Sequence, residues 1–288
     1  MNGIFVILLV NRICFSNMLL NTICKRGDLE INIRKRQEKI LEFIQEKGEL
    51  SVNELIDLIP ASPATIRRDI SFLSEKGLII RSHGYVHNPD KDSPVLPLKT
   101  RTILASHKKE QIAKKASELV KSGMTVVLDS GSTCLAIALA IKDKDITVVT
   151  NSIEICSALA LSDIKVICTG GIMENKHLCF LGKDADIFIE NIEVDIGFIG
   201  ATGVRVNSGF TTSSPLQYDF KKRLIQASRK QYIVFDSSKF YSANIYMFAN
   251  YSDEITGVIT NNSTDETAIV QLDLMRDNGL DIILSNDL

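Results

Sequence analysis

The chain has 288 residues, of which 45% are hydrophobic and 24% are charged, and its formal net charge is −2. This composition is typical of a folded globular protein and excludes an intrinsically disordered chain. The length suits two domains. A net charge close to zero neither favours nor excludes nucleic acid as a partner, because a basic face can lie within a neutral total.

The six cysteines do not have the spacing of a metal site or of a disulfide framework. No two of them form a C-x-x-C pair, and most lie among apolar residues, as small hydrophobic side chains do. We therefore expect no metal and no cofactor, and a cytoplasmic location in which thiols stay reduced.

Residues 1–33 are a strongly apolar N-terminal extension whose role is open. Asn11 and Arg12 interrupt the apolar run before it reaches the roughly 20 residues that a membrane-spanning helix needs. The segment also lacks the basic start and the cleavage site of a secretory signal. It is either an upstream extension without function or an interaction or membrane-surface segment. We expect no membrane partner, although a membrane-tethered protein would depend on residues 4–20.

Residues 34–87 have the pattern of a small helical domain. Apolar residues at helical spacing predict a first helix over 36–47, which Gly48 ends. Ser51 and Glu54 form a capping-box signature at the start of a second helix. Ser62, followed by Pro63, has the sequence of an N-cap and first helical position and predicts a third helix.

The third helix carries two adjacent arginines. Ile66, Ile70 and Leu73 are spaced to form one buried stripe, and Arg67 and Arg68 lie off that stripe. After Gly77 the run LIIRSHGYVH predicts two short strands with a turn at His83-Gly84.

This order of elements is that of a helix-turn-helix with a wing. The amino end of a third helix held in this way can enter the major groove, where guanidinium groups reach guanine or phosphate. Ser62 and Thr65 would approach the DNA backbone from the same end, and Arg81 and His83 would contact phosphates from the hairpin. The alternative is that Arg67 and Arg68 are only solvated surface residues beside Asp69.

The segment 88–97, with three prolines, is typical of an exposed linker. Residues 98–288 then alternate helical stretches with short β-branched runs, which predicts a mainly parallel α/β sheet covered on both faces. The apolar runs are MTVVLD, ITVVTN, IKVICTG, DIGFIG, QYIVFD, ITGVIT and DIILS.

Polar and glycine-rich segments follow several of these runs. Asp129 to Thr133, DSGST, connects a strand to a helix and can present backbone N–H groups and hydroxyls to an anion such as phosphate. Its alternative is a plain connecting turn. TNS, TGG, GATG and DSSK follow other strands, and ligands of open α/β sheets bind at the carboxyl ends of strands. We expect these loops to converge on one site.

The segment RQEKILEFIQEKGELSVNELIDLIPASPATIRRDISFLSEKGLIIRSHG resembles the winged helix-turn-helix of the DeoR family of bacterial transcriptional regulators. The T-I-R-R-D stretch, the following glycine and the R-x-H-G wing carry the resemblance over about fifty residues. One departure is HGYVH, where the family commonly has a second glycine after His-Gly.

Residues 98–288 resemble the effector domain of the same family, whose fold is similar to that of ribose-5-phosphate isomerase and glucosamine-6-phosphate deaminase. The resemblance implies a sugar-phosphate effector and no enzyme activity. It places Ser130, Gly131, Ser132 and Thr133 around the phosphate, with Asp129 beside them and Asn151, Gly170, Gly171 and Lys239 nearby. Lys239 is alternatively a surface lysine at a strand end.

A sugar-phosphate isomerase is the alternative function. Proton abstraction beside a carbonyl needs a carboxylate in the site, and the stretch SGFTTSSPLQYDFKKRL offers either Gln217 or Asp219 at that position. His107 and His177 have no spacing to an acid–base partner. We therefore predict a homo-oligomeric regulator, most simply a repressor, that binds operator DNA and a phosphorylated sugar.

Overall fold

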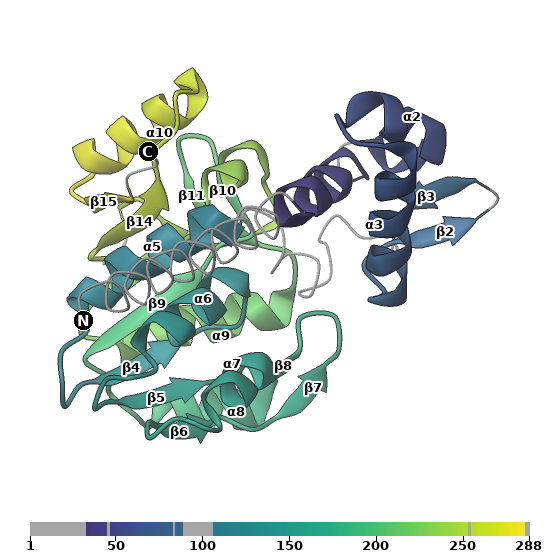
Figure 1. Ribbon diagram of the computed structural model, residues 1–288. Helices are drawn as coiled ribbons and strands as arrows, with labels where there is room; N and C mark the ends of the chain where they lie inside the picture. The colour runs from purple at the N-terminus through teal and green to yellow at the C-terminus, as the bar shows by residue number, and fades with distance from the viewer. Residues whose placement is uncertain (1–32, 45–46, 83, 89–105, 253–254, 286–288) are drawn as a thin grey trace, which may run out of the picture. The chain divides into compact units, whose positions relative to one another are not determined.

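The computed structural model describes residues 33–44, 47–82, 84–88, 106–252 and 255–285 (Figure 1). The chain divides into two compact units, Met1–Asp92 and Ser93–Leu288, and each is described by itself. The predicted boundaries at 33/34, 87/88 and 97/98 stay predictions, because residues 1–32 and most of the linker lie outside the described residues.

The first unit contains the helices and the hairpin that the sequence predicts. Residues 33–44 are helical. The Ser51 hydroxyl accepts a hydrogen bond from the backbone N–H of Glu54, whose carboxylate accepts from the backbone N–H of Ser51, so the predicted capping box is formed. The further elements are β1 (Glu49–Ser51), α2 (Val52–Leu58), α3 (Pro63–Glu75), β2 (Ile80–Ser82) and β3 (Tyr85–His87).

The wing is a three-stranded antiparallel sheet in the order β1-β3-β2. β1 is a strand that the sequence analysis missed. The turn between β2 and β3 includes Gly84 at φ +86°, a conformation that favours glycine. The predicted stripe of Ile66, Ile70 and Leu73 is fully buried.

The second unit is built on a seven-stranded parallel sheet in the order β15-β14-β12-β9-β4-β5-β6. Every predicted apolar run supplies one of its strands. These are β4 (Thr125–Leu128), β5 (Thr147–Thr150), β6 (Lys165–Cys168), β9 (Ile196–Gly200), β12 (Gln231–Val234), β14 (Gly257–Asn261) and β15 (Asp281–Ser285).

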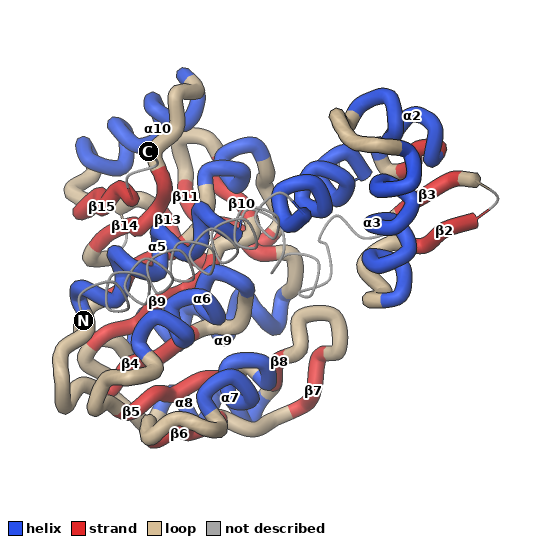
Figure 2. The backbone as a smooth tube through the Cα atoms, in the orientation of Figure 1, coloured by secondary structure: helices blue, strands red, loops and turns tan. Residues whose placement is uncertain are grey.

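Helices cover both faces of this sheet (Figure 2). One core packs α5 (Ser106–Leu119), α6 (Ser132–Ile141) and α7 (Ile153–Leu159) against one face. The other core packs α8 (Lys183–Glu190), α9 (Pro215–Ala227) and α10 (Glu266–Asp277) against the opposite face. Burial on both faces explains why the strand sequences are continuous apolar runs without alternation.

Two small antiparallel additions interrupt the parallel pattern. A hairpin of β7 (Ile172–Glu174) and β8 (Cys179–Leu181) follows β6, and a three-stranded sheet is formed by β10 (Gly203–Arg205), β11 (Gly209–Thr212) and β13 (Tyr246–Asn250). A short 3₁₀ helix, η1 (Ser237–Tyr241), follows β12. The fold is therefore mainly parallel, as expected, with two separate antiparallel sheets.

No helix among the described residues is long and apolar enough to cross a bilayer. The same residues contain no group of three or more His, Cys, Asp or Glu side chains placed as metal ligands. Residues 4–20, on which the membrane-tethered alternative depends, lie outside the described part of the chain.

Candidate DNA-binding face and candidate effector site

The arginine pair is on the solvent side of α3. Successive residues of a helix are about 100° apart around its axis, so a stripe through Ile66 and Ile70 leaves Arg67 and Arg68 on the flank and the far side. Both arginines are exposed. Within the described residues, no hydrogen bond or ion pair engages either guanidinium group. Both cations are therefore available to an external anion.

The acidic residue that follows the arginine pair does not neutralise it. The Asp69 carboxylate is turned inward and accepts hydrogen bonds from Arg36 Nε and, at 3.2 Å, from Gln37 Nε2, both on the first helix. Its side chain is only 5% exposed. Asp69 thus fixes α3 to the first helix and leaves the positive charge of the outer face uncompensated.

Ser62 and Thr65 form the amino end of α3. The Ser62 hydroxyl accepts from the Thr65 backbone N–H at 3.2 Å and shares a 2.8 Å hydrogen bond with the Thr65 hydroxyl. Ser62 is exposed and Thr65 partly buried. Both hydroxyls already form hydrogen bonds at the start of α3. A contact to a DNA phosphate would use the hydrogen-bonding capacity that remains to them.

The wing places Arg81 in the middle of β2, opposite Val86 of β3, with its side chain exposed. Val86 is fully buried, so the strand pair is anchored while Arg81 stays in solvent. The predicted contact residue His83 lies outside the described residues. Ser82 Oγ and His87 Nε2 are 3.0 Å apart across the two strands, which links them close to the turn.

In the second unit, neighbouring strands are aligned so that their carboxyl ends meet. Leu128 of β4 is in register with Phe198 of β9 and with Thr150 of β5, which is in register with Cys168 of β6. The loops after β4, β5 and β6 therefore begin at one level of the sheet edge. This alignment brings together the candidate residues Asp129, Ser130, Gly131, Ser132, Thr133, Asn151, Gly170 and Gly171.

The loop after β4 opens directly into α6. Gly131 is the N-cap of this helix at φ +137°, and no side chain caps the helix. Ser132 and Thr133, the first two helical residues, are 7% and 8% exposed. The first N–H groups of a helix have no partner within it, so the amino end of α6 offers donors and a positive dipole end at the sheet edge.

Asp129 is buried in an ion pair that the sequence analysis missed. Lys221 of α9 donates to Asp129 Oδ2 and, at 2.8 Å, to the carbonyl oxygen of Gly200, while the backbone N–H of Gly200 donates to Asp129 Oδ2 at 3.0 Å. The Lys221 ammonium also lies 5.5 Å from the centre of the Phe248 ring. The Asp129 carboxylate is thus held in a fixed position, and its charge is neutralised by Lys221.

The loops after β5 and β6 carry the next candidates. Asn151 is 1% exposed, and its Nδ2 donates to the Phe180 carbonyl at 3.0 Å. Its Oδ1 has no hydrogen-bond partner among the described residues. Gly170 and Gly171 have φ of +70° and +114°, and a Cβ at Gly171 would lie 2.7 Å from the Leu181 carbonyl oxygen, which only glycine avoids.

Lys239 is in η1 after β12, a strand separated from β4 by β9. Asp236, the N-cap of η1, is 2% exposed. Burial alone would raise the pKa of this carboxyl, but Lys239, Lys109 and the hydrogen bonds from Ser238 overcome that effect and lower the pKa to about 2. The structure therefore ties Lys239 to Asp236, and no described contact joins it to the loop after β4.

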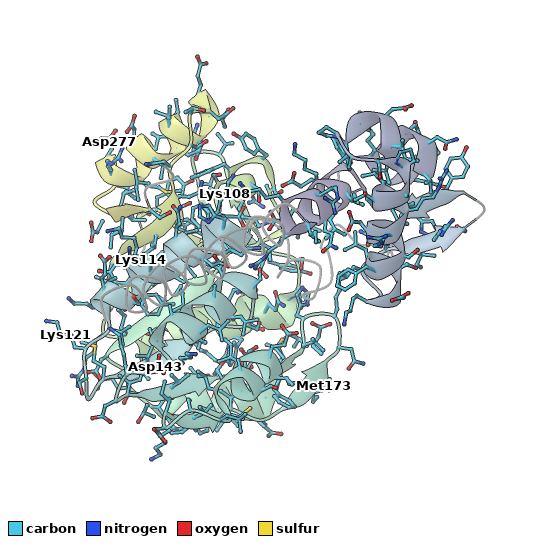
Figure 3. The ribbon with its side chains drawn as sticks, viewed as in Figure 1. Lys108, Lys114, Lys121, Asp143, Met173 and Asp277 are labelled. Carbon is cyan, nitrogen blue, oxygen red and sulfur yellow. The ribbon has the colours of Figure 1, made fainter. Side chains whose placement is uncertain are left out.

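The amino end of α5 contacts η1. Lys108, labelled in Figure 3, donates to Ser237 Oγ at 3.3 Å. Lys121, beyond the other end of α5, lies at the far side of the unit in the same view. Lysines of α5 therefore add positive charge next to η1, a contribution that strand-end motifs do not reveal.

Gln217 and Asp219, the two alternatives for the position of a catalytic acid, lie in different environments. Gln217 is 4% exposed, and its Oε1 accepts from the Thr212 hydroxyl at 2.7 Å. Asp219, the other possibility, is exposed, and its backbone carbonyl accepts from Arg223. The structure therefore places Gln217 inward and Asp219 in solvent.

The prediction that His177 has no acid–base partner is wrong. His177 Nδ1 lies 2.5 Å from Glu174 Oε2, and the same oxygen accepts from the His177 backbone N–H at 3.0 Å. The turn between β7 and β8 creates this pair. His107 instead contacts Gln111, at 2.8 Å on the next turn of α5.

Comparison with known proteins agrees with both units. The DeoR-like helix-turn-helix domain matches residues 36–91, and the DeoR C terminal sensor domain matches residues 104–262. The HTH-type transcriptional regulator IolR of Bacillus subtilis is 31% identical over 233 residues, which are 80% of this chain and 92% of that protein. The L-fucose operon activator of Haemophilus influenzae is 33% identical over 75% of this chain and 88% of its own length.

A third relative, the putative aga operon transcriptional repressor of Escherichia coli O157:H7, is 29% identical over 74% of this chain and 80% of its own length. Among solved structures, ribose 5-phosphate isomerase A from Neisseria gonorrhoeae covers 50% of this chain and 56% of its own, at 22% identity and a TM-score of 0.36. A TM-score this low supports no argument about function. The two domain matches and the relatives show that this chain belongs to the DeoR family of DNA-binding transcriptional regulators.

Proposed function

We propose that this regulator is a repressor of genes of sugar or related carbon metabolism and that a phosphorylated sugar, bound at the carboxyl edge of the β4-β5-β6 strands, changes its affinity for operator DNA. The loop Asp129–Thr133, with the uncapped amino end of α6 behind Gly131, is the observation that carries the effector part of the proposal.

The chemistry of this loop favours a phosphate. Backbone N–H groups at the start of a helix donate hydrogen bonds to an anion, and the helix dipole adds a favourable field. Gly131 leaves no side chain in the way, and the hydroxyls of Ser130, Ser132 and Thr133 are further donors. Asp129 does not repel the ligand, because Lys221 neutralises it.

The remaining candidates suit the sugar part of such a ligand. Asn151 Oδ1 is a buried acceptor without a described partner, and a sugar hydroxyl is a donor that would satisfy it. Gly170 and Gly171 let the backbone approach closely. Lys239, in η1 after β12, supplies a cation whose positive charge is partly offset by Asp236.

Operator recognition is assigned to the outer face of α3 and to the wing. Arg67 and Arg68 would contact bases or phosphates in the major groove, with Ser62, Thr65, Arg81 and His83 on the backbone. A dimer would present two α3 helices about 34 Å apart, matching half-sites one turn of DNA apart. We therefore propose a homo-oligomer as the DNA-binding form.

The coupling between the two ligands is reciprocal. If the sugar phosphate weakens operator binding by a given factor, the operator weakens sugar-phosphate binding by the same factor, typically through about 1–3 kcal/mol. The relatives include proteins named as an operon activator and as an operon repressor. If the protein is a repressor, the effector should release it from the operator. Deletion of the regulator should then raise expression of the target genes.

We propose that the domain binds its ligand without turning it over, in the cytoplasm. An amide cannot abstract a proton, so Gln217 does not replace a catalytic base, and Asp219 is exposed. Conversion of aldose to ketose phosphates by the purified protein would instead favour the isomerase alternative. Recovery of the native protein in the membrane fraction would favour the tethered alternative.

A thermal-shift screen of phosphorylated sugars tests the effector proposal. A ligand present at about 100 times its Kd stabilises the folded protein by about 2.7 kcal/mol. The matched control is the same sugar without its phosphate, which we expect to stabilise far less. Equal stabilisation by both forms, or by none of the phosphorylated sugars, would contradict the assignment of the Asp129–Thr133 loop to phosphate.

A further inference from the structure

The buried face of α9 changes from polar to apolar along the helix. Leu224 and Ala227, toward its carboxyl end, belong to the hydrophobic core, whereas Gln217 and Lys221, toward its amino end, are buried polar residues. Side chains at positions i and i+4 lie on the same face of a helix, so Gln217 and Lys221 point in one direction. Buried polar side chains need hydrogen-bond partners, and the position of α9 shows where these partners lie.

Hydrogen bonds at two levels align α9 with β9. The backbone N–H of Val194, just before β9, donates to the carbonyl oxygen of Ala227 at 2.9 Å. Lys221 donates at 2.8 Å to the carbonyl oxygen of Gly200, the last residue of β9. The helix therefore runs alongside β9 in the opposite direction, and its amino end lies at the carboxyl edge of the sheet.

Gln217 lies one helical turn before Lys221, on the side of the sheet edge where the candidate effector loop begins. Lys221 also donates to Asp129, the first residue of this loop. One turn of an α-helix is about 5.4 Å long, and a sugar phosphate is longer than that. A ligand with its phosphate at the loop Asp129–Thr133 can therefore reach Gln217 with its sugar part.

Only the oxygen of the Gln217 amide takes part in a described hydrogen bond. Its Oε1 accepts at 2.7 Å from the hydroxyl of Thr212, a fully buried residue at the end of β11, and this bond fixes the direction of the amide. Its Nε2 carries two donor hydrogens, and it forms no hydrogen bond within the described residues. Because buried polar groups are nearly always hydrogen-bonded, this oriented donor is suited to an external acceptor.

Asn151 offers the complementary group on the other side of the loop. β4 lies between β9 and β5 in the sheet, and Asn151 follows β5, so the two amides flank the loop Asp129–Thr133. Asn151 Oδ1 is an acceptor without a partner among the described residues, whereas Gln217 Nε2 is a donor. A hydroxyl group both donates and accepts. The two amides together therefore suit a polyhydroxy ligand.

We propose that Gln217 is a specificity-determining residue of the effector site, whose Nε2 donates a hydrogen bond to an uncharged oxygen of the sugar part. This inference rests on the proposed function, because it takes the phosphate to lie at the loop after β4. Lys221 does not take this role, since Asp129 and the Gly200 carbonyl already engage its ammonium group. An analogue without the sugar oxygen leaves a buried donor unpaired, which is how such a contact selects its ligand.

Isothermal titration calorimetry of the full chain tests the inference. The probes are inorganic phosphate, ribose 5-phosphate, glucose 6-phosphate, fructose 1-phosphate and fructose 6-phosphate. Gln217→Met keeps a side chain of similar size and removes the donor. The sugar phosphate that wild type binds most tightly should bind this variant roughly three- to tenfold more weakly, the effect of one uncharged hydrogen bond. Inorganic phosphate, which has no sugar oxygen, should bind both proteins equally.

Two further variants make the result decisive. Asp219→Asn, on the exposed side of the same helix, is the matched control and should bind every probe as wild type does. Gln217→Met leaves the buried Thr212 hydroxyl without its acceptor, so Thr212→Val combined with Gln217→Met, which removes both partners, is measured as well. We expect the combined variant to show the same selective loss of sugar-phosphate affinity.

Unchanged affinity for the sugar phosphate in both Gln217 variants overturns the inference and leaves the proposed function standing. An equal loss of affinity for inorganic phosphate and for the sugar phosphate also overturns it, because Gln217 would then act through the shape of the loop. If no sugar phosphate binds wild type more tightly than inorganic phosphate does, the proposed function itself fails, and the inference fails with it.

Discussion

Arg36 and Asp69 form a salt bridge between the first helix and α3, and Asp69 directly follows the exposed pair Arg67 and Arg68 in the sequence. Asp69 belongs to the scaffold and not to the outer face, so three consecutive charged residues have two different roles. Asp69 fixes α3 to the first helix, and the proposed function assigns Arg67 and Arg68 to DNA.

Loss of this salt bridge should destabilise the first unit. We expect Asp69→Ala to lower the free energy of unfolding by roughly 3 kcal/mol, the low end for a broken buried ion pair, because the Arg36 side chain is 17% exposed and keeps some hydration. Urea unfolding of the full chain measures it. Asp57→Ala, at an exposed aspartate of α2, is the control and should change stability by less than about 0.5 kcal/mol.

Removal of either arginine should weaken operator binding without loss of stability. Arg67→Ala and Arg68→Ala should each cost about 1–3 kcal/mol if the side chain contacts a base. Fluorescence anisotropy with an operator selected from random duplexes measures the change. Lys76→Ala, which removes a positive charge after the other end of α3, is the control. Unchanged binding in both arginine variants would leave the major-groove assignment without support.

The wing residue Arg81 should act through phosphate alone. Arg81→Ala should weaken binding to all sequences to a similar extent and reduce the slope of log affinity against log salt by about 0.9, the value for one phosphate contact. Salt titrations of wild type and variant give this slope. A loss confined to the selected operator, with the salt dependence unchanged, would show that Arg81 reads bases.

Replacement of the α6 hydroxyls should affect the effector only. Ser132→Ala with Thr133→Ala should abolish the response of operator binding to the sugar phosphate found in the thermal-shift screen and leave DNA binding without effector intact. Ser122→Ala, in the turn before β4 at the opposite edge of the sheet, should behave as wild type. Loss of DNA binding in the double variant would indicate a folding defect instead.

The Asp236 carboxyl should make stability depend on acid pH. Its pKa in the folded protein is about 2, below the ordinary value of 3.8. Its contribution to stability is therefore fully present above the unfolded pKa and is lost as pH falls through the folded pKa. Between pH 4 and 2 the wild type should lose about 2 kcal/mol more than Asp236→Asn does. Unfolding curves of both proteins at several pH values measure this difference. Equal losses of stability in wild type and Asp236→Asn would contradict the prediction.

Local signals in the sequence determine the helices of the first unit and the strands of the second. The Ser51–Glu54 box and the Ser62-Pro63 start act within four residues, and continuous apolar runs identify strands buried on both faces. The arginine pair is also readable, because helical periodicity alone separates Arg67 and Arg68 from the stripe of Ile66 and Ile70.

The partners of buried polar groups are decided only by the tertiary structure. Asp69 binds Arg36 from 33 positions away, and Asp129 binds Lys221 from 92 positions away. The spacing also left Gln217 and Asp219 as alternatives, and only the packing of α9 turned the amide inward and left the acid in solvent. Periodicity fixes which face of an element is apolar, but a buried charge is stable only beside a partner that the assembled fold supplies, often from a distant part of the chain.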